Sequence, residues 1–221
     1  MVKEFSQFSL KLLLGMVILL WIICWIIPAP AWAIESSIAH TVTPTVTHPA
    51  ELTKAIQAIE DLDQMRSGLA STLEGRTEEP TMATMKEVCR PVGMQAQRLS
   101  QENGWQIKQI ADKYRNPEHA PDSPQARQAL ATFRKNPDLM GFWEHETIDG
   151  QAGTRYYRRI NVEASCLACH GQKNQRPQFI QEKYLDDRAY DFNVGDLRGM
   201  YSVFMPDLQA DIQSALQDTI Q

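Results

Sequence analysis

Apolar residues recur at helical spacing in two long amphipathic segments that precede every candidate strand. In residues 50–74 they stand three, four or seven positions apart, which predicts one helix. Residues 81–102 repeat this pattern and stop at Asn103-Gly104, a typical helix end. Pro91 lies inside this second segment. Because a proline there removes a backbone hydrogen bond, we expect a kink or a late restart of the helix.

After residue 104 the pattern changes to short alternating or aromatic-rich segments, which predict strands. The predicted strands are residues 105–114, 141–148, 154–162 and 197–205. Asp149-Gly150 lies between two of them and is typical of a two-residue hairpin turn. The predicted short helices are residues 124–133 and 178–185, and an amphipathic helix over residues 207–221 ends the chain. Helices followed by antiparallel strands with intervening helices predict one α+β domain.

The first 33 residues have the pattern of a targeting segment. Lys3 and Lys11 precede an apolar run over residues 12–27, and an Ala-x-Ala sequence ends at Ala33. This order predicts a secretory signal peptide over residues 1–33, cleaved after Ala33. An uncleaved membrane anchor is the alternative, because the apolar run is almost long enough to span a bilayer. In either case we expect the rest of the chain in the periplasm or the thylakoid lumen, attached to a membrane only through residues 12–27.

Composition limits the classes of protein that the sequence can represent. The chain has 221 residues, of which 43% are hydrophobic and 22% charged, which is enough for one packed domain. Its formal net charge of −5 argues against a nucleic-acid-binding protein, which would carry a basic excess on one face. Residues 34–49 are rich in Thr and Pro and predict an extended linker. We therefore expect the domain itself to occupy residues 50–221.

The most specific motif in the chain is Cys166-Leu-Ala-Cys169-His170. The pattern Cys-x-x-Cys-His is the attachment sequence of a c-type haem. Two thiols three residues apart can each form a thioether with one haem vinyl group, and the adjacent imidazole can then bind the iron. The motif predicts one covalent haem c, with Cys166 and Cys169 as its thioether links and His170 as the proximal iron ligand. Because attachment follows export, we expect the cytochrome c maturation machinery as a partner.

The two motif cysteines could instead form a redox pair, a zinc site or a structural disulfide. A Cys-x-x-Cys redox pair usually belongs to a thioredoxin-like βαβ context, which the predicted order of elements lacks. A structural zinc site needs four ligands, and no second Cys/His pair of similar spacing is found in the sequence. A disulfide between Cys166 and Cys169 is possible but strained. The sequence favours haem over these three.

The other axial position of the iron has several candidate ligands. Soluble c-type electron carriers often use methionine there. The candidates are Met65, Met82, Met85, Met94, Met140, Met200, Met205, His119 and His145. Cys89 is a further candidate, because it shares the apolar stripe of residues 81–102 with Met82 and Met85. That position alone favours a small buried hydrophobic residue, which is what most free cysteines are.

Four segments of the chain, taken together, indicate a protein family. They are Val88-Cys89, Tyr114-Arg-Asn-Pro-Glu-His-Ala-Pro121, Cys166-Leu-Ala-Cys-His-Gly171 and Gly195-Asp-Leu-Arg-Gly-Met-Tyr-Ser-Val203. Together they resemble the PAS-like c-type haem domain family, which occurs alone in cyanobacteria and as a periplasmic input module of bacterial sensor kinases. The resemblance covers about residues 51–206. His119 departs from it, because the family more often carries asparagine there.

The resemblance implies a fold and a ligand set. The implied fold is an antiparallel PAS-like sheet flanked by helices, with an N-terminal helical region. The implied ligands are a proximal histidine, matching His170, and a distal cysteine, matching Cys89. This makes an iron ligand the favoured interpretation of Cys89.

A thiolate from Cys89 would stabilise ferric iron and give a lower potential than a His/Met cytochrome has. We therefore expect low-potential electron transfer with a redox partner protein. The alternative is a redox or gas (CO or NO) sensor, in which release of Cys89 signals to a partner. With both axial positions filled we expect no enzymatic activity of the peroxidase kind. The candidate cations for the haem propionates are Arg155, Arg158, Arg159 and Arg198.

Overall fold

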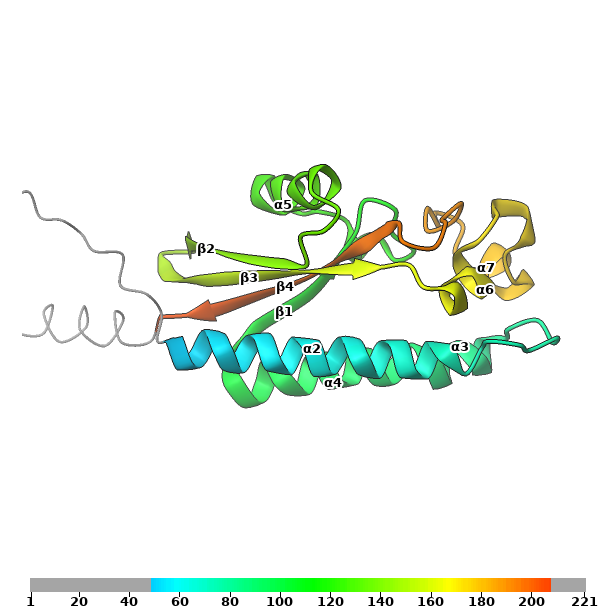
Figure 1. The fold of residues 1–221 in the computed structure, drawn as a ribbon, viewed down its shortest axis with the longest axis horizontal. Coiled ribbons are helices and arrows are strands. Elements are labelled where there is room, and N and C mark those ends of the chain that lie inside the picture. The colour runs from blue at the N-terminus through cyan, green and yellow to red at the C-terminus, as the bar shows by residue number, and fades with distance from the viewer. Residues whose placement is uncertain (1–48, 208–221) are drawn as a thin grey trace, which may run out of the picture. The chain divides into compact units, whose positions relative to one another are not determined.

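The computed structural model describes residues 49–207 (Figure 1). The predicted signal segment and the predicted linker up to residue 48 lie outside the described residues. The helix predicted over residues 207–221 also lies outside them, apart from its first residue. The described residues form a four-stranded antiparallel sheet with the order β1-β4-β3-β2. The strands are β1 (Gln106–Ile110), β2 (Gly141–Ile148), β3 (Gln151–Asn161) and β4 (Leu197–Pro206).

Helices cover both faces of this sheet (Figure 1). The helices α2 (Pro49–Ser71), α3 (Met82–Val88) and α4 (Arg90–Asn103) lie on one face, and α5 (Pro124–Lys135) lies on the other. The connection from β3 to β4 contains η4 (Ala164–Cys166), α6 (Leu167–His170), η5 (Lys173–Gln175) and α7 (Gln178–Lys183). A single 3₁₀ turn, η3 (Pro117–His119), precedes α5.

The inner strand β4 is buried on both sides. Tyr201 and Val203 pack with Ile59 of α2, whereas Met200 packs with Phe133 of α5. Successive residues of a strand point to opposite faces, so a strand between two helical layers needs apolar residues at nearly every position. This arrangement confirms the predicted α+β fold with an antiparallel sheet flanked by helices.

The segment predicted as one helix over residues 81–102 is broken at Cys89 into α3 and α4. The break is the restart that Pro91 indicated, because Pro91 has no N–H to donate to the preceding turn. Gly104 ends α4 with a φ of 69°, as the Asn103-Gly104 sequence predicted.

Several predicted element ends were too late, among them that of the helix predicted over residues 178–185, which stops at Lys183. The strand predicted over residues 105–114 stops at Ile110, because the Ala111 N–H donates to the His119 carbonyl and turns the chain into a loop. The first helix ends at Ser71 rather than at residue 74. The hairpin is confirmed: Asp149 and Gly150 have φ values of 52° and 84°, as a type I′ turn requires. No helix within residues 49–207 combines the length and the apolar composition needed to cross a bilayer.

Candidate functional site

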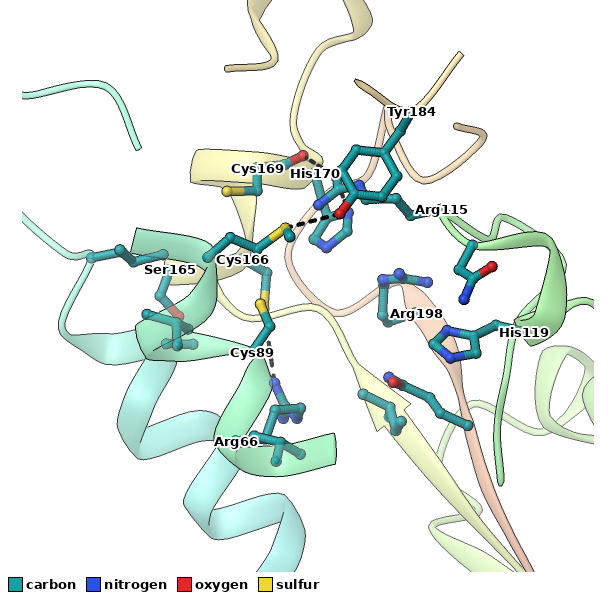
Figure 2. A pocket seen from close by; sticks show the side chains of 18 residues that line it. Arg66, Cys89, Arg115, His119, Ser165, Cys166, Cys169, His170, Tyr184 and Arg198 are labelled. Carbon is teal, nitrogen blue, oxygen red and sulfur yellow. Dashed lines mark hydrogen bonds between the residues drawn. The ribbon is translucent and has the colours of Figure 1, made fainter. Parts of the chain in front are cut away.

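One cavity gathers the residues that the sequence predicted for the site (Figure 2). It lies where the end of α2, the junction of α3 and α4, the turn α6 and the start of β4 meet. Cys89, Cys166, Cys169 and His170 all line it. Cys89 comes from a different part of the chain than the other three, so the fold, and not local spacing, brings it to the motif.

The Cys-x-x-Cys-His motif occupies a single helical turn. Cys166 ends η4 and is the N-cap of α6, and Cys169 and His170 complete that turn. The Gly171 N–H donates to the Leu167 carbonyl at 2.9 Å and ends the turn. A Cβ atom at Gly171 would lie 2.7 Å from that carbonyl oxygen, so the tight turn requires glycine. Residues three apart in such a turn are neighbours on one side, which brings both thiols to the cavity.

The imidazole of His170 is fixed by a backbone hydrogen bond. Its Nδ1 lies 2.8 Å from the Ala189 carbonyl oxygen, which can only accept, so Nδ1 carries the proton and Nε2 keeps its lone pair. Arg115 Nη2 lies near the same nitrogen but donates to the Cys169 carbonyl at 2.8 Å. The edge of Phe192 packs against the ring at a centroid distance of 6.1 Å. The tautomer is therefore the one that offers Nε2 to a metal.

The surroundings of His170 keep the ring neutral. Burial lowers the pKa of the imidazole well below its usual range, and the guanidiniums of Arg198 and Arg115 lower it further. A neutral imidazole is the form that binds a metal ion.

Cys89 is the junction residue between the helices α3 and α4. It is the C-cap of α3 and the N-cap of α4, and its N–H donates to the Met85 carbonyl at 2.8 Å. Its side chain is exposed and lines the cavity, so the interpretation as a small buried hydrophobic residue is wrong. Desolvation by the cavity walls raises the pKa of its thiol, and the guanidiniums of Arg115 and Arg198 oppose that rise.

Three arginines line the cavity, and only one of them lacks a carboxylate partner in the described part of the chain. Arg66 pairs with Asp63 and Glu163, and Arg115 pairs with the buried Asp187. Arg198 donates to a backbone carbonyl at 3.0 Å and has no carboxylate of residues 49–207 within ion-pairing distance. Burial and the Arg115 charge lower the pKa of Arg198 to about 10. The cavity thus holds an uncompensated cation, which favours an anionic group.

The other arginines that the sequence suggested lie elsewhere. Arg155 pairs with Glu146 and Arg158 with Glu60, while Arg159 donates to the Phe133 carbonyl. None of these three arginines lines the cavity. Sequence reasoning had missed Arg66 and Arg115. Arg115 lies within one of the four segments that carried the family resemblance, whereas nothing in the helical pattern distinguished Arg66.

Few of the candidate axial ligands of the iron line the cavity. Besides Cys89, only Met85 and His119 of the candidate ligands in residues 49–207 line it. The Tyr184 hydroxyl donates to the Met85 sulfur at 3.7 Å, which occupies that thioether. Burial and the Arg198 charge lower the pKa of His119.

The rest of the cavity surface is largely apolar, with one unpaired hydroxyl. Its apolar side chains include Ala70, Leu73, Val88, Val92 and Ile160. Ser165 Oγ is buried at the wall and has no hydrogen-bond partner within residues 49–207. An apolar wall with an unpaired hydroxyl and an uncompensated guanidinium suits a flat apolar group that carries carboxylates. The residues present therefore fit the haem that the motif predicts.

The sequence profile described as Tll0287-like matches residues 45–206. The chain belongs to the Tll0287-like family. A similar solved structure is that of the cyanobacterial haem protein Tll0287, with 59% sequence identity and a TM-score of 0.65. The similarity covers 72% of this chain and 96% of that one. No match was found among curated proteins.

The Tll0287-like assignment confirms the resemblance that the four sequence segments indicated. The matched residues run from before α2 to the end of β4, so they include every wall of the cavity.

Proposed function

We propose that this protein is an exported c-type haem protein that acts in low-potential electron transfer. Cys166 and Cys169 carry the haem through two thioether bonds. His170 is the proximal iron ligand and Cys89 the distal one. The convergence of these four residues on one largely apolar cavity carries the proposal. The similarity to a haem protein at 59% identity supports it.

The side chains of the cavity have separate tasks in this proposal. When bound, the haem supplies a one-electron ferric/ferrous couple. His170 offers Nε2 because the Ala189 carbonyl holds its Nδ1 proton. Arg198 and Ser165 have donors left for the propionate carboxylates, since Arg198 has no anionic partner and Ser165 no hydrogen bond within the described chain.

The proposed low potential follows from an anionic Cys89 ligand. Thiolate is the form of cysteine that binds metals. Burial raises the pKa of the free Cys89 thiol, and the charges of Arg115 and Arg198 offset that rise only in part, so bonding to the iron would have to supply the rest of the stabilisation of the thiolate. An anionic sulfur ligand stabilises the ferric state more than the ferrous state, in contrast to a neutral methionine.

A second function, redox or gas sensing, is supported by the location of Cys89. This residue stands at a break between two short helices, and its side chain makes no capping hydrogen bond. A ligand on such a junction can leave by local movement of α3 and α4. Release of Cys89 would open a position for CO or NO and could be signalled to a partner protein.

The experiment is to produce the protein in a host with cytochrome c maturation and to measure its intact mass and its EPR spectrum. We expect a covalent haem adduct and a low-spin ferric spectrum typical of thiolate ligation. Cys89→Ala should convert this spectrum to a high-spin one or to that of another ligand. The controls are Met85→Leu and His119→Asn, which remove the other two candidates and should leave the spectrum unchanged.

The results separate the parts of the proposal. A wild-type protein without an adduct rejects the haem. An unchanged spectrum in Cys89→Ala, with a change in one control, moves the ligand to that residue. Electron transfer predicts six-coordinate iron in both oxidation states, whereas sensing predicts that reduced protein binds CO and loses Cys89.

A further inference from the structure

A buried carboxylate lies behind His170, outside the lining of the cavity. Asp187 follows α7, and its side chain is 0% exposed. It is absent from the residues that line the cavity. A carboxylate is almost never fully buried unless it is paired, so the contacts of Asp187 explain its position.

Two guanidiniums and one backbone N–H converge on this carboxylate. Arg176 Nη1 lies 2.6 Å from Oδ2, and Arg115 Nε lies 3.4 Å from Oδ1. The Ala189 N–H donates to Oδ1 at 3.0 Å. These three contacts fix the position of the Asp187 carboxylate.

Two of these contacts lead directly to the haem motif. The Ala189 residue whose N–H is bound to Asp187 also accepts the Nδ1 proton of His170 at its carbonyl, at 2.8 Å. The Arg115 side chain that pairs with Asp187 also donates to the Cys169 carbonyl at 2.8 Å. One carboxylate therefore supports both the imidazole and the backbone at the end of α6.

We propose that Asp187 is a positioning residue for His170, and this inference rests on the proposed haem function. It anchors Ala189 through the backbone N–H, on the residue whose carbonyl accepts the Nδ1 proton, and thereby helps to keep Nε2 as the metal-binding atom. Through Arg115 it fixes the Cys169 carbonyl, so the ring and the turn that carries it are oriented together. Partners of this kind around a metal-binding histidine determine its orientation and its basicity.

The test compares two substitutions of Asp187 in the haem-loaded full-length protein. Asp187→Asn removes a negative charge near the iron, which favours the ferrous state. We expect the ferrous-to-ferric ratio at a fixed potential to rise about tenfold, equivalent to about 59 mV for one electron. Asp187→Glu keeps the charge but moves the carboxylate, so it should alter the EPR g-values of the ferric haem while changing the potential less.

Asp186→Asn is the matched control. Asp186 is the adjacent residue, carries the same charge and is exposed. Solvent screens it, so its substitution should change neither the g-values nor the ferrous-to-ferric ratio appreciably. Equal effects of Asp186→Asn and Asp187→Asn on both measurements would show that Asp187 acts only as a remote charge and would overturn the proposal.

Arg176→Gln provides a second route if Asp187→Asn yields no folded protein. It removes one partner of Asp187 without touching the motif, and we expect the same change in g-values as in Asp187→Glu, reduced in size. Wild-type g-values in both Asp187→Glu and Arg176→Gln would reject the positioning role. A wild-type protein that carries no haem would instead reject the proposed function, so the two failures are distinguishable.

Discussion

Arg66 Nη2 lies 2.7 Å from the Glu163 carboxylate and thereby joins α2 to the segment that begins the haem motif. Ser67, the next residue of α2, donates to the other Glu163 oxygen at 2.6 Å. Arg66 also pairs with Asp63 at 2.7 Å, and Asp63 in turn contacts Arg158 of β3 at 2.8 Å. A single chain of charges therefore connects helix, sheet and motif.

Glu163→Gln should destabilise the protein. It weakens an ion pair and a hydrogen bond to α2, and we expect a loss of about 1–2 kcal/mol in the free energy of unfolding. Partial exposure of Glu163 keeps the figure at the low end of that range. Urea denaturation monitored by far-UV circular dichroism gives the value. The control is Glu102→Gln, because Glu102 is an exposed residue of α4. This substitution should change the free energy of unfolding by less than about 0.5 kcal/mol.

The contribution of Glu163 should depend on pH. Burial alone would raise the pKa of this carboxyl, but the hydrogen bonds from Ser67 and Arg66 outweigh that effect and lower it. A lowered pKa in the folded state means that the stabilisation is complete above the ordinary pKa of about 4.3 and is lost as the pH falls through the folded value. The difference in unfolding free energy between wild type and Glu163→Gln should therefore shrink between about pH 5 and about pH 2. A difference that stays constant over this interval contradicts the prediction.

Arg198→Gln should lower the midpoint potential of the haem. The guanidinium is a half-buried positive charge at the cavity, and its removal favours the ferric state. A decrease of about tenfold in the ferrous-to-ferric ratio, about 59 mV, is the expected size. Potentiometric titration followed by absorption gives the value. Arg198→Lys retains the charge, so its midpoint potential should stay closer to that of the wild type. A shift in potential as large as that of Arg198→Gln would contradict a charge effect.

Single-thioether variants should retain haem. Cys166→Ser and Cys169→Ser each leave one thiol on α6 and the His170 ligand, so one bond can still form. We expect each single variant to carry covalent haem with a shifted pyridine haemochrome band. The Cys166→Ser/Cys169→Ser double variant should release its haem on acid–acetone extraction. Covalent haem in the double variant would mean that another residue is attached.

Two glycines should respond in opposite ways to alanine. A Cβ at Gly153 on β3 would collide with the Met205 carbonyl and lie 2.6 Å from the Phe204 ring, so Gly153→Ala should cost about 1–3 kcal/mol. A Cβ at Gly68 on α2 meets nothing within 4 Å, and Gly68→Ala should stabilise the helix by about 0.5–1 kcal/mol. Thermal denaturation of both variants tests the pair. A stabilised Gly153→Ala would show that strand β4 can move aside.

The sequence predicted the parts of the site that depend on neighbouring residues. The Cys-x-x-Cys-His spacing falls on one turn, and Pro91 signalled the break beside Cys89. The break itself explains why the helical pattern misjudged Cys89: a continuous helix would direct it to the core, whereas the junction directs it to the cavity. Arg66 and Asp187 could not be predicted, because each acts through a residue that is distant in sequence.

The same reasoning applies to the fold. Binary patterns predicted the four strands and the helices α2, α5 and α7, and they predicted α3 and α4 as one helix. The single turns η3, η4, α6 and η5 are too short to carry an apolar period and were not predicted by it. The strand order could not be read from them. Strand β1 pairs with β4 and not with β2, and this choice depends on tertiary packing between Ile110, Met200 and the helix α5.

Strand β4 is the last element of the described chain, yet it lies between β1 and β3 in the sheet and contributes Arg198 to the cavity. A chain that emerges from its N-terminus first would present the two thiols of α6 before this strand arrives. During that interval no completed sheet would enclose them, and the maturation enzymes would meet an open peptide. Closure by β4 would then surround the haem that we propose on these thiols, so under the proposed export the attachment would precede completion of the sheet.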